Sequence, residues 1–280
     1  MRRLAVLLVI SGTIGSICAE IKPPKPGVNF FSPQQDVQLG KEAKAQVESQ
    51  MPVIHDNNIN GYLSQIGKKL AASPHAGDWP FSFEGIYDKN INAFALPGGP
   101  MFVNTATITA ADNEAQLAGV MAHEMSHVVL RHGTHQMTKQ QFVQLPALLA
   151  GNVMGNGILG AIGKLGVNLA ANSVLLKYSR DAEAQADYNG ALIMADAGYN
   201  PIEMARFFEK LESKGSEGQL AQFLSDHPTP GNRVRSVEQE IQQLPQKDYK
   251  EDITGQLASV KNAVQHLTPP PVKKQPNPQQ

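Results

Sequence analysis

Residues 115–127 read AQLAGVMAHEMSH, and this stretch decides how the rest of the chain is interpreted. Its small and apolar residues favour a helix, which carries the pattern His-Glu-x-x-His at His123, Glu124 and His127. Residues four apart on a helix lie about 40° apart on one face, so both imidazoles can bind one metal ion. Glu124 lies beside them and can take a proton from a metal-bound water molecule. The pattern predicts a zinc hydrolase, although three fixed positions also recur by chance in unrelated chains.

A catalytic zinc site needs a third protein ligand. The extended motif, with a third histidine ten residues after His123, is excluded because Gly133 occupies that position. His132 and His135 stand at the wrong helical distance from the motif, and we interpret them as surface residues. The third ligand is therefore expected further along the chain.

An acidic pair downstream is the better candidate for that ligand. Residues 179–187 read SRDAEAQAD, in which Glu183 and Asp187 are four apart and share one face of a predicted helix. One carboxylate can ligate zinc while the other accepts the free N–H of a ligand histidine. The alanines between them allow close packing against the first helix, whereas a solvated acidic face is the alternative.

Composition limits the chemistry further. The only cysteine, Cys18, lies in the N-terminal leader, so a thiolate zinc site and disulfides are excluded from the mature chain. The metal must then be held by histidine and carboxylate groups. The formal net charge of the 280 residues is −1, and no basic stripe is present, so we expect no nucleic-acid partner.

The leader, residues 1–19, predicts export. Arg2 and Arg3 form a positive start, an apolar stretch follows, and small residues precede a cleavage point before Glu20. The apolar stretch is shorter than the roughly 20 residues that span a bilayer. We therefore expect a periplasmic protein with a cleaved signal peptide, with a lipoprotein or membrane-anchored form as the less favoured alternative.

The mature chain is expected to form one catalytic domain over residues 34–267. A Pro-rich lead-in at 20–33 precedes it, and a Pro- and Gln-rich tail at 268–280 is expected to be disordered. Within the domain, residues 142–176 are apolar and Gly-rich, and we interpret them as a helical hairpin near the cleft or a membrane-contacting patch.

The order of predicted elements indicates the fold class. Helical patterns also cover residues 34–50, 57–72, 181–197, 201–213, 233–244 and 253–267. Strand patterns cover residues 81–87, 91–96 and 101–104. Helices on both sides of a small sheet predict a mostly helical α+β fold, with an antiparallel β-meander beside the active-site helix.

These motifs together carry a family resemblance. HExxH followed by Ser-Arg-x-x-Glu-x-x-Ala-Asp resembles the HtpX/CAAX-protease-type zinc metallopeptidases, which are HExxH gluzincins, and within them the soluble periplasmic BepA-like branch. Residues 92–99, NAFALPGG, resemble the edge strand of that family, and residues 225–233, SDHPTPGNR, resemble its His-Pro…Arg element. The resemblance covers roughly residues 35–245. It does not extend to the C-terminal helical-repeat domain of BepA-like proteins.

The resemblance implies a zincin-like domain with one Zn2+ per chain. Glu183 would be the third ligand beside His123 and His127, and Asp187 would contact a ligand histidine. Metalloendopeptidase activity would follow from this arrangement.

The resemblance also implies roles in binding and in the transition state. Arg233 would stabilise the oxyanion, and His227 would either orient substrate or occupy the open position of zinc at rest. An extended substrate would pair with an edge strand formed by Asn92, Ala93, Phe94, Ala95 and Leu96.

The expected function is hydrolysis of extended or misfolded envelope proteins in protein quality control, with contact to the membrane or the outer-membrane assembly machinery. One alternative is a zinc-binding chaperone or assembly factor with latent protease activity. A remote alternative is a dinucleotide-binding protein, since residues 155–160 match GxGxxG. It is disfavoured because Pro146 falls in the supposed first strand and the motif lacks a second half.

Overall fold

The computed structural model describes residues 28–140, 178–213, 221–228, 233–244 and 247–269. The predicted signal peptide, the apolar segment 142–176 with its GxGxxG match, and residues 270–280 of the predicted tail lie outside the described residues. Within the part of the chain that the structure describes, no helix has the length and apolar character needed to cross a membrane.

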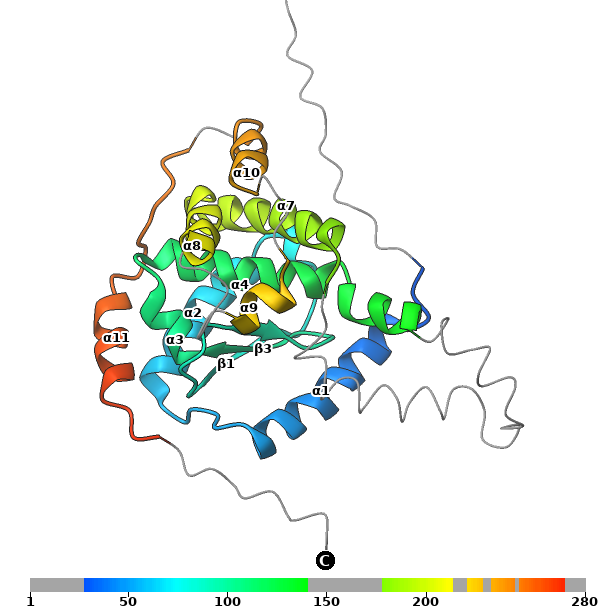
Figure 1. Ribbon diagram of the computed structural model, residues 1–280, viewed down its shortest axis with the longest axis horizontal. Helices are drawn as coiled ribbons and strands as arrows, with labels where there is room; N and C mark the ends of the chain where they lie inside the picture. Colours follow the sequence, from blue (N-terminus) through cyan, green and yellow to red (C-terminus); the bar gives the residue numbers. More distant parts are fainter. Residues whose placement is uncertain (1–27, 141–177, 214–220, 229–232, 245–246, 270–280) are drawn as a thin grey trace, which may run out of the picture.

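The mostly helical α+β class is confirmed (Figure 1). The helices are α1 (Pro33–Gln50), α2 (Asn57–Ala71), the short 3-10 helix η1 (Pro74–Ala76), α3 (Thr105–Ala110), α4 (Glu114–Val129), α7 (Arg180–Ala197), α8 (Ile202–Ser213), α9 (Ala221–Asp226), α10 (Arg233–Ile241) and α11 (Leu257–Gln265). A further helical segment at 132–140 follows α4.

The predicted antiparallel meander is wrong. Strands β1 (Ser82–Ile86), β2 (Ala93–Ala95) and β3 (Pro100–Asn104) form a sheet in the order β1-β3-β2. β3 pairs parallel with β1 and antiparallel with β2. The last strand takes the central place because all of its residues are buried, and the connection between β1 and β2 crosses to the far side. Alternating patterns locate strands along the chain, but they do not decide strand order.

Side-chain caps explain where the two site-bearing helices begin. Asn113 accepts a hydrogen bond from the backbone of Gln116 at the start of α4, and Ser179 accepts one from Ala182 at the start of α7. Such caps satisfy backbone N–H groups that lack partners within the helix. Both helices therefore start at defined residues, which sets the rotation of the side chains that follow.

Helix α4 lies in the interior, between the sheet on one side and α7 and α8 on the other (Figure 1). Every residue from Glu114 to Val128 is buried. Two glycines allow the helices to approach closely. A Cβ on Gly119 would lie 2.7 Å from the Cα of Met204, and a Cβ on Gly190 would lie 3.3 Å from the backbone nitrogen of His123. The contact at Gly119 brings α8 against α4, and the contact at Gly190 brings the acidic face of α7 to the histidines of α4.

Candidate metal centre

The structure brings four candidate ligands into one buried cluster. His123 and His127 extend from α4, Glu183 from α7, and His227 directly follows α9. One donor atom from each lies within 4.8 Å of the others. All four side chains are almost fully buried, with Glu183 and His123 at 0% exposure.

The spacing of these donor atoms fits a metal ion. His123 Nε2 lies 3.0 Å from His127 Nε2, 3.3 Å from Glu183 Oε2 and 3.3 Å from His227 Nδ1. Glu183 Oε1 lies 3.5 Å from His127 Nε2 and 3.2 Å from His227 Nδ1. Donors held about 2.0–2.1 Å from a tetrahedral ion lie about 3.3 Å from one another. The cluster therefore has the size and the donor types of a tetrahedral metal site.

Asp187 and Arg233 surround this cluster. Asp187 Oδ1 lies 2.9 Å from His123 Nδ1, the ring nitrogen that faces away from the other donors. Arg233, the first residue of α10, donates from Nε to Asp187 Oδ2 at 2.6 Å and from Nη2 to Glu183 Oε2 at 2.9 Å. Its guanidinium also lies over the Phe208 ring, 4.3 Å from the centroid. These contacts make Arg233 the counter-charge of two buried carboxylates, which burial alone would destabilise.

Glu124 lies beside the cluster and is 2% exposed. Its Oε1 is 3.3 Å from His227 Nε2, but among the described residues no donor makes a hydrogen bond to that oxygen. Burial raises the pKa of Glu124, and this effect is partly offset by His227 and His123. A buried carboxylate oxygen without a donor is a place where a water molecule can bind.

The other ionisable groups respond to the same burial. For Glu183, burial alone would raise the pKa, but His227 and His123 hold it well below its usual range. For His123, burial alone would lower the pKa, yet hydrogen bonds to Asp187 and Glu183 raise it to about 9.

The interpretation of His132 as a surface residue is wrong. His132 is 5% exposed, and its Nδ1 lies 2.9 Å from His127 Nδ1. The prediction assumed one continuous helix through His132, but α4 ends at Val129 and Arg131 adopts a positive φ of 56°. A new helical segment therefore starts at His132. Burial lowers the pKa of His132 to about 4. His135 is half-buried.

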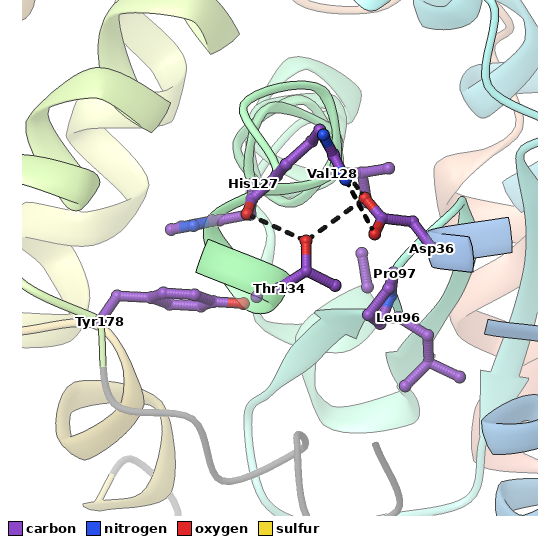
Figure 2. Close-up of a pocket in the computed structure, with 10 residues that line it drawn as sticks. Asp36, Leu96, Pro97, His127, Val128, Thr134 and Tyr178 are labelled. Atoms are coloured by element: carbon purple, nitrogen blue, oxygen red, sulfur yellow. Dashed lines mark hydrogen bonds and ion pairs between the residues drawn. The ribbon is translucent and has the colours of Figure 1, made fainter. Parts of the chain in front are cut away.

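Sequence reasoning also missed Tyr178. Its ring stacks on His127 with 3.9 Å between ring centroids and an interplanar angle of 21°. The two rings line one side of a small pocket, with Leu96, Pro97 and Asp36 opposite and Thr134 between them (Figure 2). An aromatic residue directly before the Ser-Arg motif was the only sequence signal available.

Strand β2 is at the edge of the sheet and contacts α4. The carbonyl of Asn92 and the N–H of Leu96 bond to β3. In an antiparallel pair the alternate residues, Ala93 and Ala95, therefore direct their backbone groups to the free side. A backbone hydrogen bond from Ala95 to Glu124 agrees with that direction. The edge predicted for substrate pairing thus faces the cluster.

Comparison with known proteins places this site in a family. The profile of Peptidase family M48 matches residues 57–241. The beta-barrel assembly-enhancing protease of Yersinia pestis is 29% identical over 222 residues, 76% of this chain and 45% of that protein. The putative beta-barrel assembly-enhancing protease of Vibrio cholerae is 31% identical over 75% of this chain and 45% of its own length. The mitochondrial metalloendopeptidase OMA1 of Schizosaccharomyces pombe is 30% identical over 72% of this chain and 57% of its own length.

The chain spans about half the length of these curated relatives. The family match includes the whole cluster together with Glu124, Asp187 and Arg233. The expected resemblance and the metalloendopeptidase class are thereby confirmed at the level of the family. The chain belongs to peptidase family M48.

Proposed function

We propose that this protein is a zinc-dependent endopeptidase in which His123, His127 and Glu183 hold one Zn2+ and Glu124 is the general base. The observation that carries the proposal is the buried cluster of nitrogen and carboxylate donors with a donor-free carboxylate oxygen of Glu124 beside it. Such a donor set suits zinc, and three ligands leave one position for a water molecule.

Each residue around the metal site has its own proposed role in hydrolysis. Zinc, when bound, supplies a Lewis acid and lowers the pKa of water toward about 7. Glu124 Oε1 takes the proton from the attacking water and returns it to the leaving amine. Arg233 holds the carboxylates of Glu183 and Asp187, and Asp187 keeps the Nδ1 hydrogen on His123 so that Nε2 faces the cluster. These contacts favour a positioning role for Arg233 over the predicted oxyanion role.

Substrate would bind as an added strand along β2. The backbone of Ala93 and the carbonyl of Ala95 face the free side, while the N–H of Ala95 contacts Glu124, so a strand paired there would have a scissile carbonyl near Glu124. Strand addition reads the backbone and tolerates many side chains, so extended or unfolded segments are the expected substrates. We propose unfolded or misfolded envelope proteins, and contact with outer-membrane assembly machinery, because two relatives are named beta-barrel assembly-enhancing proteases.

Removing any one of the three proposed ligands is expected to abolish metal binding. His123→Ala, His127→Ala and Glu183→Gln each leave two of the three proposed permanent ligands, and His227, which is proposed to leave the cluster during turnover, should not retain zinc in place of the third. Metal analysis of the purified proteins should find one zinc per wild-type chain and almost none in these variants. His135→Ala, a half-buried histidine outside the cluster, is the control and should keep its zinc. Full zinc occupancy in the Glu183 variant would move the third ligand elsewhere.

Export is expected to remove the leader. The mature protein should start near Glu20 and be recovered from the periplasm, because the positive start and apolar stretch precede small residues suited to cleavage. N-terminal sequencing of the protein from fractionated cells checks this. A periplasmic chain that begins at Met1 would contradict cleavage.

A second candidate function is that of a zinc-binding chaperone or assembly factor whose protease activity is latent. One observation favours it: His227 contributes a fourth donor to the cluster and also approaches Glu124. A site with four protein ligands has no position for water. The two candidates share the metal and differ in whether His227 leaves the cluster.

A further inference from the structure

The two histidines of α4 are held differently on the side away from the cluster. His123 Nδ1 meets the carboxylate of Asp187, as described above. His127 Nδ1 meets another imidazole, since His132 Nδ1 lies 2.9 Å away. The far nitrogen of His132, Nε2, lies 3.1 Å from Gln185 Oε1. Gln185 and Asp187 both belong to α7, so one helix supports both histidines, one of them through His132.

The hydrogen bonds that link Gln185, His132 and His127 fix where the hydrogen atoms of both imidazoles lie. Gln185 Oε1 can only accept, so His132 Nε2 carries the hydrogen. The other nitrogen of a neutral imidazole is then an acceptor, so the hydrogen between the two rings belongs to His127 Nδ1. That tautomer leaves the lone pair of His127 Nε2 directed at the cluster, where Glu183 and His123 lie.

We propose that His132 is a positioning residue for the metal site, which fixes the tautomer and ring orientation of His127 through its Nδ1. The proposal rests on the proposed metal-binding function. It adds a residue outside the HExxH motif that contacts a ligand histidine of that motif. His127 is then fixed twice, because His132 holds its edge and Tyr178 covers its face. Partners of this kind make a ligand histidine a better donor to metal.

The chain reaches this arrangement through a break in the helix. On an uninterrupted helix, His132 would be rotated about 140° from His127 and could not meet it. Arg131 breaks the helix with its φ of 56°, a conformation that non-glycine residues rarely adopt. Asp36 of α1 holds that turn, because Arg131 donates from Nε to Asp36 Oδ2 at 2.6 Å and also binds the carbonyl of Phe31. Backbone strain that is held in place by surrounding contacts is typical of functional sites.

The test measures the zinc affinity of the full chain by competition with a chelator. His132→Phe keeps the ring but removes both nitrogens, and we expect its Kd for zinc to rise about 10- to 100-fold. His132→Asn places an amide oxygen at the position of Nδ1 and should restore the Kd to within about threefold of wild type. His135→Phe makes the same change three residues away and should leave the Kd unaltered. Activity is not needed for this measurement.

Spectroscopy supplies a second readout. In the zinc-loaded wild type, long-range proton–nitrogen NMR should find the hydrogen of His127 on Nδ1 and that of His132 on Nε2. Cobalt(II) bound to His132→Phe should give an altered visible spectrum, whereas cobalt(II) bound to His132→Asn should match wild type. A hydrogen on His132 Nδ1 would overturn the proposal.

The outcomes separate this proposal from the metal site itself. Wild-type zinc affinity in His132→Phe, or equal losses in the Phe and Asn variants, overturns the role of His132 and leaves the metal site intact. A wild-type protein that binds no zinc overturns the metal site. If circular dichroism shows that His132→Phe does not fold, the zinc Kd of Gln185→Leu is measured instead. This change removes the hydrogen-bond acceptor of His132 at a half-buried position. A Kd raised about threefold or more supports the proposal, and an unaltered Kd overturns it.

Discussion

Replacement of Glu124 by glutamine is expected to remove nearly all hydrolysis while the fold and the metal remain. Glu124 is not among the four clustered donors, and glutamine has the same shape, so the cluster should be preserved. Glutamine cannot accept the proton of the attacking water at Oε1. The loss of a general base lowers turnover by about 10²- to 10⁴-fold. The measurement is kcat/KM for an unfolded protein substrate, combined with metal analysis of the same sample.

Glu209→Gln is the matched control for this experiment. It makes the same chemical change at an exposed position on α8, and it should leave both activity and zinc unaltered. Normal turnover by Glu124→Gln would end the proposed mechanism. Loss of zinc from that variant would instead make Glu124 a ligand. A wild type that binds zinc yet hydrolyses nothing would favour the chaperone alternative.

The parts of the site that follow from helix geometry could be predicted from the sequence. The two histidines of HExxH are four residues apart, and so are Glu183 and Asp187, and this spacing places each pair on one helix face. The structure places both pairs at one buried cluster, although His123 and Asp187 are 64 residues apart in the chain. Local spacing was sufficient because each helix is rigid and its starting residue is capped.

The parts that depend on distant residues could not be predicted. The strand order follows from which strand is buried on both faces, and the predicted meander was therefore wrong. The position of His132 depends on the turn at Arg131, which Asp36 holds from 95 residues away. No periodicity contains that information, because the pattern around His132 would also suit a continuous helix.

The contacts of Arg233 also could not be predicted from the sequence. The resemblance assigned it to the oxyanion, and that role stays a prediction. Its observed contacts are with Glu183 and Asp187, two carboxylates that are almost fully buried. A buried acidic pair needs a cation nearby, so the pair itself implied that some arginine or lysine would bind it. The sequence could not say which one, because α10 lies 46 residues beyond Asp187.

Removal of the His227 imidazole is expected to increase cleavage of unfolded substrates while zinc stays bound. His227 Nδ1 lies 3.2 Å from Glu183 Oε1, and its Nε2 lies 3.3 Å from Glu124 Oε1, so the ring lies between the cluster and the proposed base. A water molecule that attacks substrate needs that same place. In His227→Ala the three proposed ligands remain, and the fourth position is open. If about a tenth of wild-type molecules have the ring displaced, the gain in kcat/KM approaches about tenfold.

The packing around His227 supplies a graded variant for the same measurement. Phe223 stacks on His227 with 5.0 Å between ring centroids, so Phe223→Leu should loosen the ring and give a smaller increase than His227→Ala. His266→Ala removes an exposed imidazole outside the site and should alter neither turnover nor zinc content. A fall in turnover for His227→Ala at unaltered zinc content would reject the resting-state role. His227 would then act on substrate directly, and its displacement would no longer be needed for a cycle of hydrolysis.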